Sequence, residues 1–354
     1  MRLFLVLPTH LPIPSNLVLE HTKGLLHSFA PAKEVQMIVV GDVVDPIFVE
    51  YCQSLESVSI QSSQQAAQFI KGVTNAVVFH FGAQLNWAKG FQQYFIPLLL
   101  PKQTASLSLL QRYLFANKFE KWMKGATKVI ATNDWAFEQL TLHCPSYLSK
   151  LQLLSFPIQD LPAFEWQDLA ATKAKLTADN NYFLVFAPAA RFVDILKEFS
   201  IFKKWQQTTM HLVFVLETPA EVTLAKEQLR GYKFKAAVSV YDLQELNLSW
   251  LAATYAVLCE GVSYRHAMWM EYAIQMEIPL LLDTQLTLPT HWQKSGELFA
   301  FSEKMALSNH FKLYYKDEVY RQNRARTGKE WLMDKHQSDS HLDLFNKIVL
   351  SFNN

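Results

Sequence analysis

The sequence contains little glycine and little cysteine. Its ten glycines in 354 residues are less than half of the usual share of about 7%. Elaborate glycine-rich loops that wrap phosphate groups are therefore not expected. The three cysteines, Cys52, Cys144 and Cys259, are odd in number, far apart and never arranged as C-x-x-C. They argue against a disulfide framework or a zinc site and favour a reducing compartment.

The chain also lacks an excess of either charge and a long hydrophobic run. Its 33 basic and 32 acidic side chains give a net charge of +1, so no global field attracts nucleic acid or an anionic membrane. The longest apolar candidate, "YFIPLLLP", is interrupted by Pro97 and Pro101, whereas a membrane helix needs about 20 residues. The apolar residues Leu3 to Leu7 are too few for the core of a signal peptide. We expect a cytoplasmic protein with no nucleic-acid partner, and a peripheral contact with the inner face of the membrane stays open.

The sequence does contain a regular alternation of short apolar runs and amphipathic stretches. Apolar runs that are not alternating in polarity and that are separated by helices are typical of parallel sheets covered on both faces. The predicted strands are residues 2–8, 35–42, 75–82, 128–133 and 151–156 in the first half, and 182–188, 211–217, 236–242, 255–261 and 278–283 in the second. The sequence therefore predicts an α/β protein with two doubly wound domains in tandem.

The alternation lapses between Gln159 and Asn181, where "QDLPAFEWQDLAATKAKLTADNN" carries a proline, mixed charges and no buried-strand run. We interpret this stretch as the connection between the domains. Ligands of such sheets bind beyond the carboxyl ends of the strands, so the residues that directly follow strands are the candidates for a site in a cleft between the domains.

Glu260 and Gly261 directly follow the predicted strand "YAVLC" and precede a predicted helix. The glycine would let the backbone approach a ligand, and the glutamate would accept hydrogen bonds from sugar hydroxyls; an ordinary strand-to-helix turn explains the same residues. Arg265 and His266 lie in the first turns of that helix, where the macrodipole disfavours cations unless an anion offsets it. An anionic ligand and a solvent-facing pair are both compatible with this pattern.

Two further residues stand at the ends of strands. Arg191 follows "FAPAA", where a guanidinium would hold a diphosphate through two hydrogen bonds, or would simply lie on a surface loop. His80 lies inside "VVFHFG" and is either a packed core histidine or a functional one. The arginines of "RQNRAR", from Arg321 to Arg326, are typical of a solvated helix face. The sequence has no Walker loop, no G-x-G-x-x-G, no G-x-S-x-G and no Cys/His metal spacing.

The order of several segments resembles that of the retaining glycosyltransferases of the GT-B fold that carry an E-x7-E motif. "KWMKGATKVIATNDWAFEQL" is similar to the family's "ADxVIAxS", "LLSFPIQDLPAF" to "VIPNGVDxxxF", and "YFLVFAPAARFVDILKEFSIF" to "LLFVGRLxxxKGxDxLIxAF". "MHLVFVLETPAE" is similar to "xLxIVGxGPx", and the residues from Val238 to Leu282 are similar to the segment that contains the two glutamates. The resemblance covers roughly Thr127 to Leu282.

This resemblance implies a role for each matched residue. Glu260 would be the first glutamate, which meets the donor sugar, and Arg191 would replace the lysine that binds the diphosphate. Ser263 and Tyr264 would lie near the backbone that contacts sugar and phosphate, with Gly261 and Arg265 beside them. Glu271 would be the second glutamate, which grips the ribose. Glu260 and Glu271 are eleven residues apart, whereas the motif places them eight apart.

The resemblance also implies the organisation and the reaction. Residues 1–160 would form a Rossmann-like acceptor domain that supplies His80, residues 161–335 a nucleotide-sugar domain, and residues 336–354 a helix that returns to the first domain. The expected activity is transfer of a sugar, with retention, from a nucleotide-diphosphate donor to a glycan or lipid-linked acceptor in polysaccharide biosynthesis, without a metal or other cofactor. The alternatives are a degenerate GT-B protein that binds a sugar nucleotide or a partner transferase, and a GT-B sugar-nucleotide epimerase. The sequence leaves the oligomeric state open.

Overall fold

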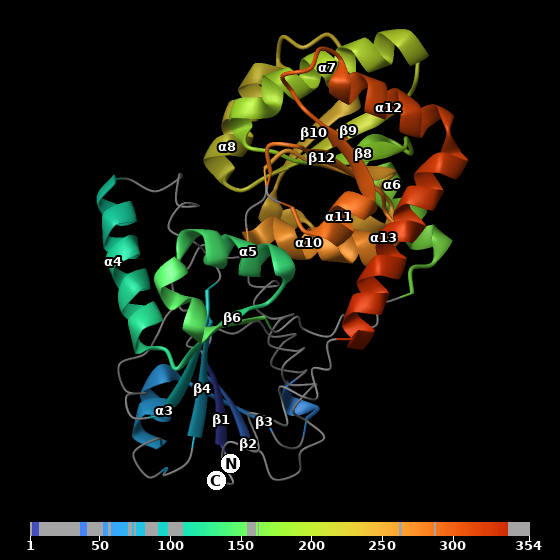
Figure 1. The fold of residues 1–354 in the computed structure, drawn as a ribbon. Helices are drawn as coiled ribbons and strands as arrows, with labels where there is room; N and C mark the ends of the chain where they lie inside the picture. The colour runs from blue at the N-terminus through green and yellow to red at the C-terminus, as the bar shows by residue number, and fades with distance from the viewer. Residues whose placement is uncertain are drawn as a thin grey trace. The chain divides into compact units, whose positions relative to one another are not determined.

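A computed structural model describes residues 2–6, 36–40, 52–55, 58–69, 73, 76–81, 91–97, 109–153, 161, 163–261, 264–286 and 288–338. The described residues divide into two compact units, one before Asp160 and one from Asp160 to Ser338 (Figure 1). Most of the helix expected for residues 336–354 lies outside the described residues. Each unit is built around a parallel sheet of its own.

The sheet of the first unit has seven strands in the order β3-β2-β1-β4-β5-β6-β7. All of its neighbouring pairs are parallel. The central strands β1 and β4 are apolar and buried on both faces, as the sequence predicts for a covered parallel sheet. The strands are β1 (Arg2–Val6), β2 (Gln36–Val40), β3 (Val58–Gln61), β4 (Ala76–Phe81), β5 (Gln92–Ile96), β6 (Lys128–Ala131) and β7 (Leu151–Leu153).

The described helices of this unit are α3 (Ser63–Phe69), α4 (Leu109–Gly125), α5 (Asp134–His143) and the 3-10 helix η4 (Pro145–Lys150). Helix α5 begins where the side chain of Asn133 accepts a hydrogen bond of 2.8 Å from the backbone N–H of Ala136. Helix α4 ends where the Lys150 ammonium donates to the carbonyls of Lys124 and Ala126, at 2.8 Å each. Both helix ends are thus satisfied by side chains of the same unit.

The sheet of the second unit has six strands in the order β10-β9-β8-β11-β12-β13, again with parallel neighbours. Its strands are β8 (Tyr182–Phe186), β9 (His211–Leu216), β10 (Val238–Asp242), β11 (Ala256–Cys259), β12 (Leu280–Asp283) and β13 (Gly296–Phe299). The chain starts at β8, proceeds outward to β10 and then returns to β11 on the other side of β8. The direction in which successive strands are added to the sheet therefore reverses between β8 and β11, as it does at the switch point of a Rossmann fold.

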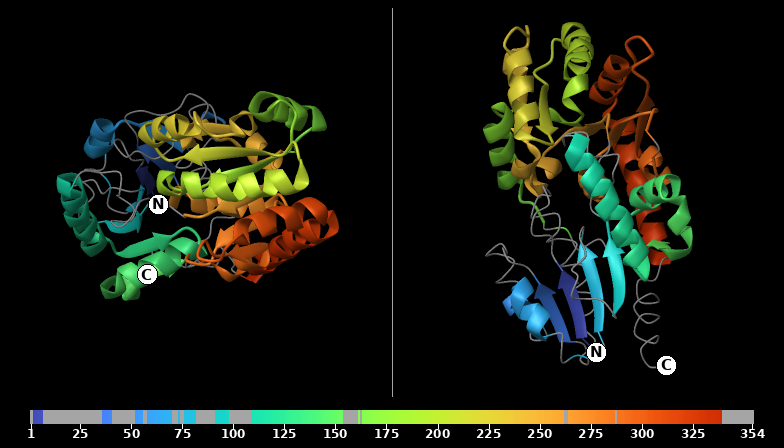
Figure 2. Two further views of the ribbon diagram at one scale, coloured as in Figure 1. Left: turned by 90° about the horizontal axis from the view of Figure 1, so that it is seen from above. Right: turned by 90° about the vertical axis from the view of Figure 1, so that its left-hand side faces the viewer.

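Helices cover both faces of this sheet, above and below the strands in Figure 1 and again in the side view of Figure 2. Helices α7 (Phe192–Gln206), α8 (Pro219–Leu229) and α12 (Ala306–Lys316) supply the apolar side chains that pack on one face. The other helices are α6 (Trp166–Thr177), α9 (Leu248–Ala252), α10 (Tyr264–Gln275), α11 (Thr290–Lys294) and α13 (Glu318–Ser338). On the opposite face the Tyr182 hydroxyl donates to the Trp250 carbonyl in α9, and Phe186 packs on His266 in α10.

The structure corrects the sequence prediction at four places. Strands β3, β5 and β13 were not predicted, because their residues are only partly apolar or partly buried. The stretch from Gln159 to Asn181 is not only a connection, since it contains α6 of the second unit. That helix has a weak apolar periodicity because its buried residues are only Thr172, Leu176 and Thr177.

Candidate functional site

Charged side chains lie at or shortly after the carboxyl ends of four neighbouring strands of the second unit. Glu217 directly follows β9, Glu260 directly follows β11, and Asp283 is the last residue of β12. Arg191 ends the short 3-10 helix η5 (Ala189–Arg191) that follows β8, and it immediately precedes α7. Because the carboxyl ends of parallel strands meet at one edge of a sheet, these residues gather where α/β sheets bind ligands, and the pair β8 and β11 marks the switch point.

Arg191 and Glu260 form an ion pair across this switch point. The Arg191 Nε donates to Glu260 Oε1 over 2.7 Å. The Glu260 side chain is 7% exposed, whereas that of Arg191 is 40% exposed. A second carboxylate, Asp194 in the first turn of α7, lies 3.8 Å from the guanidinium, and the ring of Phe301 lies 5.2 Å from its centre. The arginine is therefore held by a buried carboxylate on one side and accessible to solvent on the other.

The environment of Glu260 raises the pKa of its carboxyl to about 7. Burial is the largest cause, because it disfavours the charged form. The Arg191 guanidinium opposes this effect, whereas the negative charges of Asp283 and Asp194 add to it. Glu260 is thus a carboxyl group that exchanges a proton near neutral pH, at the edge of the sheet where a ligand would lie.

The turn between β11 and α10 is packed against the segment that follows β8. A Cβ atom at Gly261 would lie 3.1 Å from the Cδ of Pro188, so glycine allows this close approach. The carbonyl of Gly261 lies 3.1 Å from Nδ1 of His266, whose ring packs against Phe186 at 4.9 Å between centroids. Glu217 and Asp283 were given no role in the sequence analysis. Glu260 was selected because it follows a strand, and the same rule would have selected these two residues.

Glu271 is bonded to a neighbouring helix. Its carboxylate accepts hydrogen bonds from Nε2 of His291, at 2.9 and 3.0 Å, and from Nε1 of Trp292, at 2.9 Å. Both partners are buried residues of α11. The bonds join α10 to α11, so Glu271 has a structural task here, and its expected grip on a ribose stays a prediction.

The other predicted site residues differ in what the structure shows of them. Ser263 lies outside the described residues, and Tyr264 and Arg265 begin α10 with side chains that are not described. His80 is fully buried in β4 of the first unit, paired in register with Val6 on β1 and Phe95 on β5. A role for His80 in the reaction stays a prediction.

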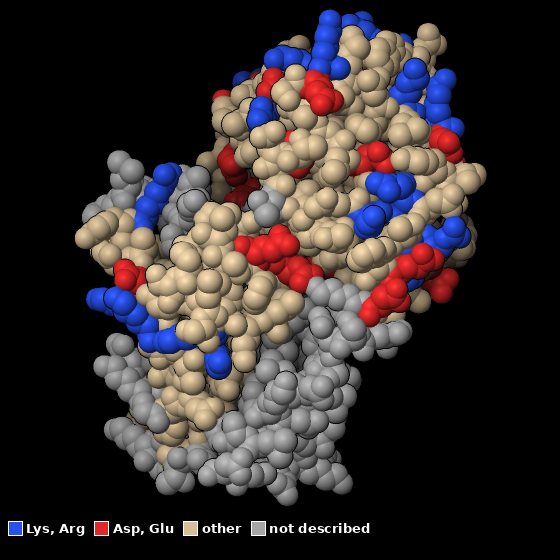
Figure 3. All heavy atoms as spheres, viewed as in Figure 1, with Lys and Arg blue, Asp and Glu red and all other residues tan. Residues whose placement is uncertain are grey.

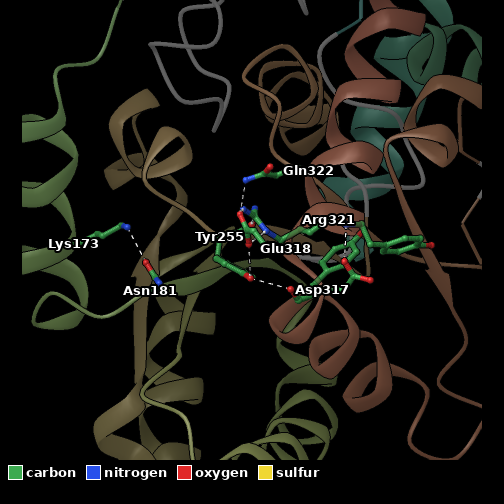
Figure 4. Close-up of polar contacts among 9 residues, drawn as sticks. Lys173, Asn181, Tyr255, Asp317, Glu318, Arg321 and Gln322 are labelled. Carbon is green, nitrogen blue, oxygen red and sulfur yellow. Dashed lines mark hydrogen bonds and ion pairs between the residues drawn. The ribbon is translucent and has the colours of Figure 1, made fainter.

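The arginines of α13 contact residues of their own unit. Arg321 lies 4.1 Å above the ring of Tyr255, donates to the Tyr255 carbonyl over 2.7 Å and pairs with Glu318 (Figure 4). Arg324 pairs with Glu297 at 2.8 Å. These contacts fasten α13 to the sheet. On the face shown in Figure 3, basic and acidic side chains are both present and interspersed.

Two absences hold for the part of the chain that the structure describes. No three His, Cys, Asp or Glu side chains gather there in an arrangement that would hold a metal ion. None of its helices has the length and the apolar character needed to cross a membrane.

No protein-family model matches the sequence, and no curated protein matches it.

Solved structures do match over nearly the whole chain. HepE from Anabaena, in complex with UDP and glucose, matches with a TM-score of 0.66 and 11% identity over 100% of this chain and 99% of its own. The chain has the GT-B fold. A glycosyltransferase from Rickettsia africae matches with a TM-score of 0.60 and 11% identity over 98% of both chains. A UDP-N-acetylglucosamine 2-epimerase matches with a TM-score of 0.54 and 10% identity over 96% of both chains. The predicted α/β fold with two parallel sheets is confirmed.

Proposed function

We propose that this protein is a glycosyltransferase that moves a sugar from a uridine diphosphate donor to a glycan or lipid-linked acceptor, with retention of configuration. The observation that supports this most is the pairing of Arg191 with Glu260 at the switch point of the second sheet. The fold is shared with HepE, whose structures contain UDP and UDP-glucose. The second unit would bind the donor and the first unit the acceptor.

Arg191 would bind the diphosphate of the donor and stabilise it as it leaves. A planar guanidinium donates two parallel hydrogen bonds to phosphate oxygens, and this role needs no metal. The amino end of α10 would add its positive dipole. Glu260 would accept hydrogen bonds from the hydroxyls of the donor sugar, so donor binding would replace part of the ion pair by contacts with the ligand.

The first test is binding by calorimetry and thermal shift, using UDP, UDP-glucose and the corresponding GDP and ADP sugars. We expect a UDP sugar to bind and Arg191→Ala to weaken it by roughly tenfold to a hundredfold, since a charged hydrogen bond contributes about 1.5–3 kcal/mol. Arg230→Ala, which removes an exposed arginine at the end of α8, is the matched control. If no sugar nucleotide binds, the proposal fails; if one binds equally well to Arg191→Ala, the assignment of Arg191 is wrong.

One observation favours a second candidate, a sugar-nucleotide epimerase. Glu260, with a pKa of about 7, suits proton transfer at neutral pH, and epimerases share the fold. Incubation with UDP-N-acetylglucosamine in heavy water separates the two reactions. Deuterium in the sugar ring without transfer would favour the epimerase. UDP binding without any turnover, across a panel of acceptors, would favour a protein that binds sugar nucleotides without catalysis.

A further inference from the structure

His266 connects the carboxyl ends of three adjacent strands. Its Nδ1 lies 3.1 Å from the carbonyl of Gly261, after β11, and its ring packs on Phe186, the last residue of β8. Its Nε2 lies 3.8 Å from Oε1 of Glu217, after β9. The side chain is 5% exposed, so its contacts are fixed by the surrounding protein rather than by solvent.

We propose that His266 is a positioning residue for the turn that carries Glu260, and that Glu217 controls its protonation. The proposal rests on the donor site described above and deepens it. His266 would not touch the reacting atoms. It would fix the carbonyl of Gly261, and through this turn the orientation of the neighbouring Glu260 toward Arg191 and the donor sugar.

The hydrogen bond to Gly261 determines the tautomer. A carbonyl oxygen only accepts, so Nδ1 of His266 must carry the proton. In the neutral ring, the lone pair of Nε2 faces the Glu217 carboxylate, and these two acceptors repel each other. When Nε2 is also protonated, the ring becomes a cation beside Glu217, and the two attract each other.

Two nearby features act on this protonation in opposite directions. His266 lies in the first turn of α10, where the helix dipole disfavours a cation. The Glu217 carboxylate favours one. Asp283 at the end of β12 adds negative charge along the same sheet edge, Glu260 adds it only above about pH 7, and Arg191 adds positive charge. The charge of His266, and with it the attraction to the segment after β9, thus responds to Glu217, whose Oε1 lies 3.8 Å from Nε2.

The test compares His266→Asn with His266→Leu. The amide of asparagine can donate from nearly the position of Nδ1 but cannot be protonated, whereas leucine cannot donate at all. We expect His266→Leu to weaken UDP-glucose by about tenfold more than it weakens UDP, because Glu260 faces the sugar and leucine loses the hydrogen bond to the Gly261 carbonyl. His266→Asn should recover most of that loss. His310→Asn, on α12, is the control for a histidine of the same unit.

A second measurement needs no donor. In protein labelled with ¹⁵N-histidine, the His266 resonances, assigned by their loss in His266→Asn, should show a proton on Nδ1 at pH 8. Glu217→Gln should lower the pH at which Nε2 gains a proton and leave the Nδ1 bond intact. A proton on Nε2 rather than Nδ1 at pH 8, an unchanged titration in Glu217→Gln, or equal losses of UDP-glucose in the leucine and asparagine variants would overturn the proposal. If UDP and UDP-glucose do not bind the wild type, the proposed function fails, and the donor-site role of His266 fails with it; the NMR result then reports only the local contacts.

Discussion

At the scale of single residues, Glu260 shows burial outweighing an ion pair. Its partner Arg191 favours the charged form, yet the pKa is raised from 4.5 to about 7. Between pH 4.5 and 7 the folded protein therefore retains a proton that the unfolded chain has lost. By linkage, the contribution of Glu260 to the free energy of unfolding falls as the pH rises through that window, and this loss of stability is complete above pH 7.

Glu260→Gln should remove this loss. A shift of this size corresponds to about 3 kcal/mol at pH 8, so we expect the variant to gain up to that amount in the free energy of unfolding at pH 8 and little at pH 4.5. Urea denaturation at the two pH values measures the difference. Glu227→Gln, an exposed glutamate of α8, should give no such difference, and an equal effect of both variants would refute the account of Glu260.

Lys150 is a second residue whose role was not evident in the sequence. Its ammonium donates hydrogen bonds to three backbone carbonyls at or just after the end of α4, those of Met123, Lys124 and Ala126. Lys150→Met keeps the length of the side chain and removes the donors, so we expect a loss of about 1–3 kcal/mol. Hydrogen exchange should increase in the last turn of α4. Lys121→Met, an exposed lysine of the same helix, should leave that exchange unchanged.

At the scale of elements, the packing of α13 depends on one glycine. A Cβ atom at Gly328 would lie 2.0 Å from the Cβ of Ser295, the residue after α11. Gly328→Ala should therefore destabilise the unit by about 1–3 kcal/mol through overpacking, although alanine is the better helix former by about 1 kcal/mol. Gly231→Ala is the matched control, because its Cβ would meet nothing within 4 Å. Thermal unfolding of both variants decides the matter; a stabilised Gly328→Ala would contradict this packing.

The sequence predicts a strand well where the strand is buried on both faces, because its own residues then form a continuous apolar run. Strands such as β8 and β11 are apolar on both faces, and their runs are unmistakable. Strand β3 is half-buried throughout, and β5 begins with two glutamines, so neither has such a run. These strands form because neighbours already in the sheet offer hydrogen bonds, which is a tertiary effect.

The same distinction applies to the candidate site. Arg191 and Glu260 could be selected from the sequence because each follows a strand, and their ion pair follows from the order of those strands. Glu271 bonds to two residues of α11, about 20 positions further along the chain, and the contact of His266 with Glu217 joins α10 to the end of β9. Sequence spacing contains no information on such contacts between elements, so the roles of these side chains required the structure.

At the scale of the whole molecule, each unit has its own hydrophobic core. One cluster of buried side chains joins β8, β9, α7 and α12 in the second unit, and another joins β1, β2 and β4 in the first. Separate cores of this kind allow each unit to unfold without the other, which departs from a single two-state transition.

Phe311→Ala and Phe79→Ala test this independence. Phe311 is fully buried on α12, with its ring 4.6 Å from that of Phe183 on β8, and Phe79 is fully buried on β4, stacked 4.9 Å from Tyr94 on β5. Each substitution should cost about 3–5 kcal/mol, because it leaves a cavity in a packed core. Native-state hydrogen exchange should show the loss of protection in β8 and β9 for Phe311→Ala, and in β1 and β4 for Phe79→Ala. UDP added to Phe311→Ala should restore protection in the second unit, to which we assign donor binding; equal losses in both units would instead show that the two cores unfold as one.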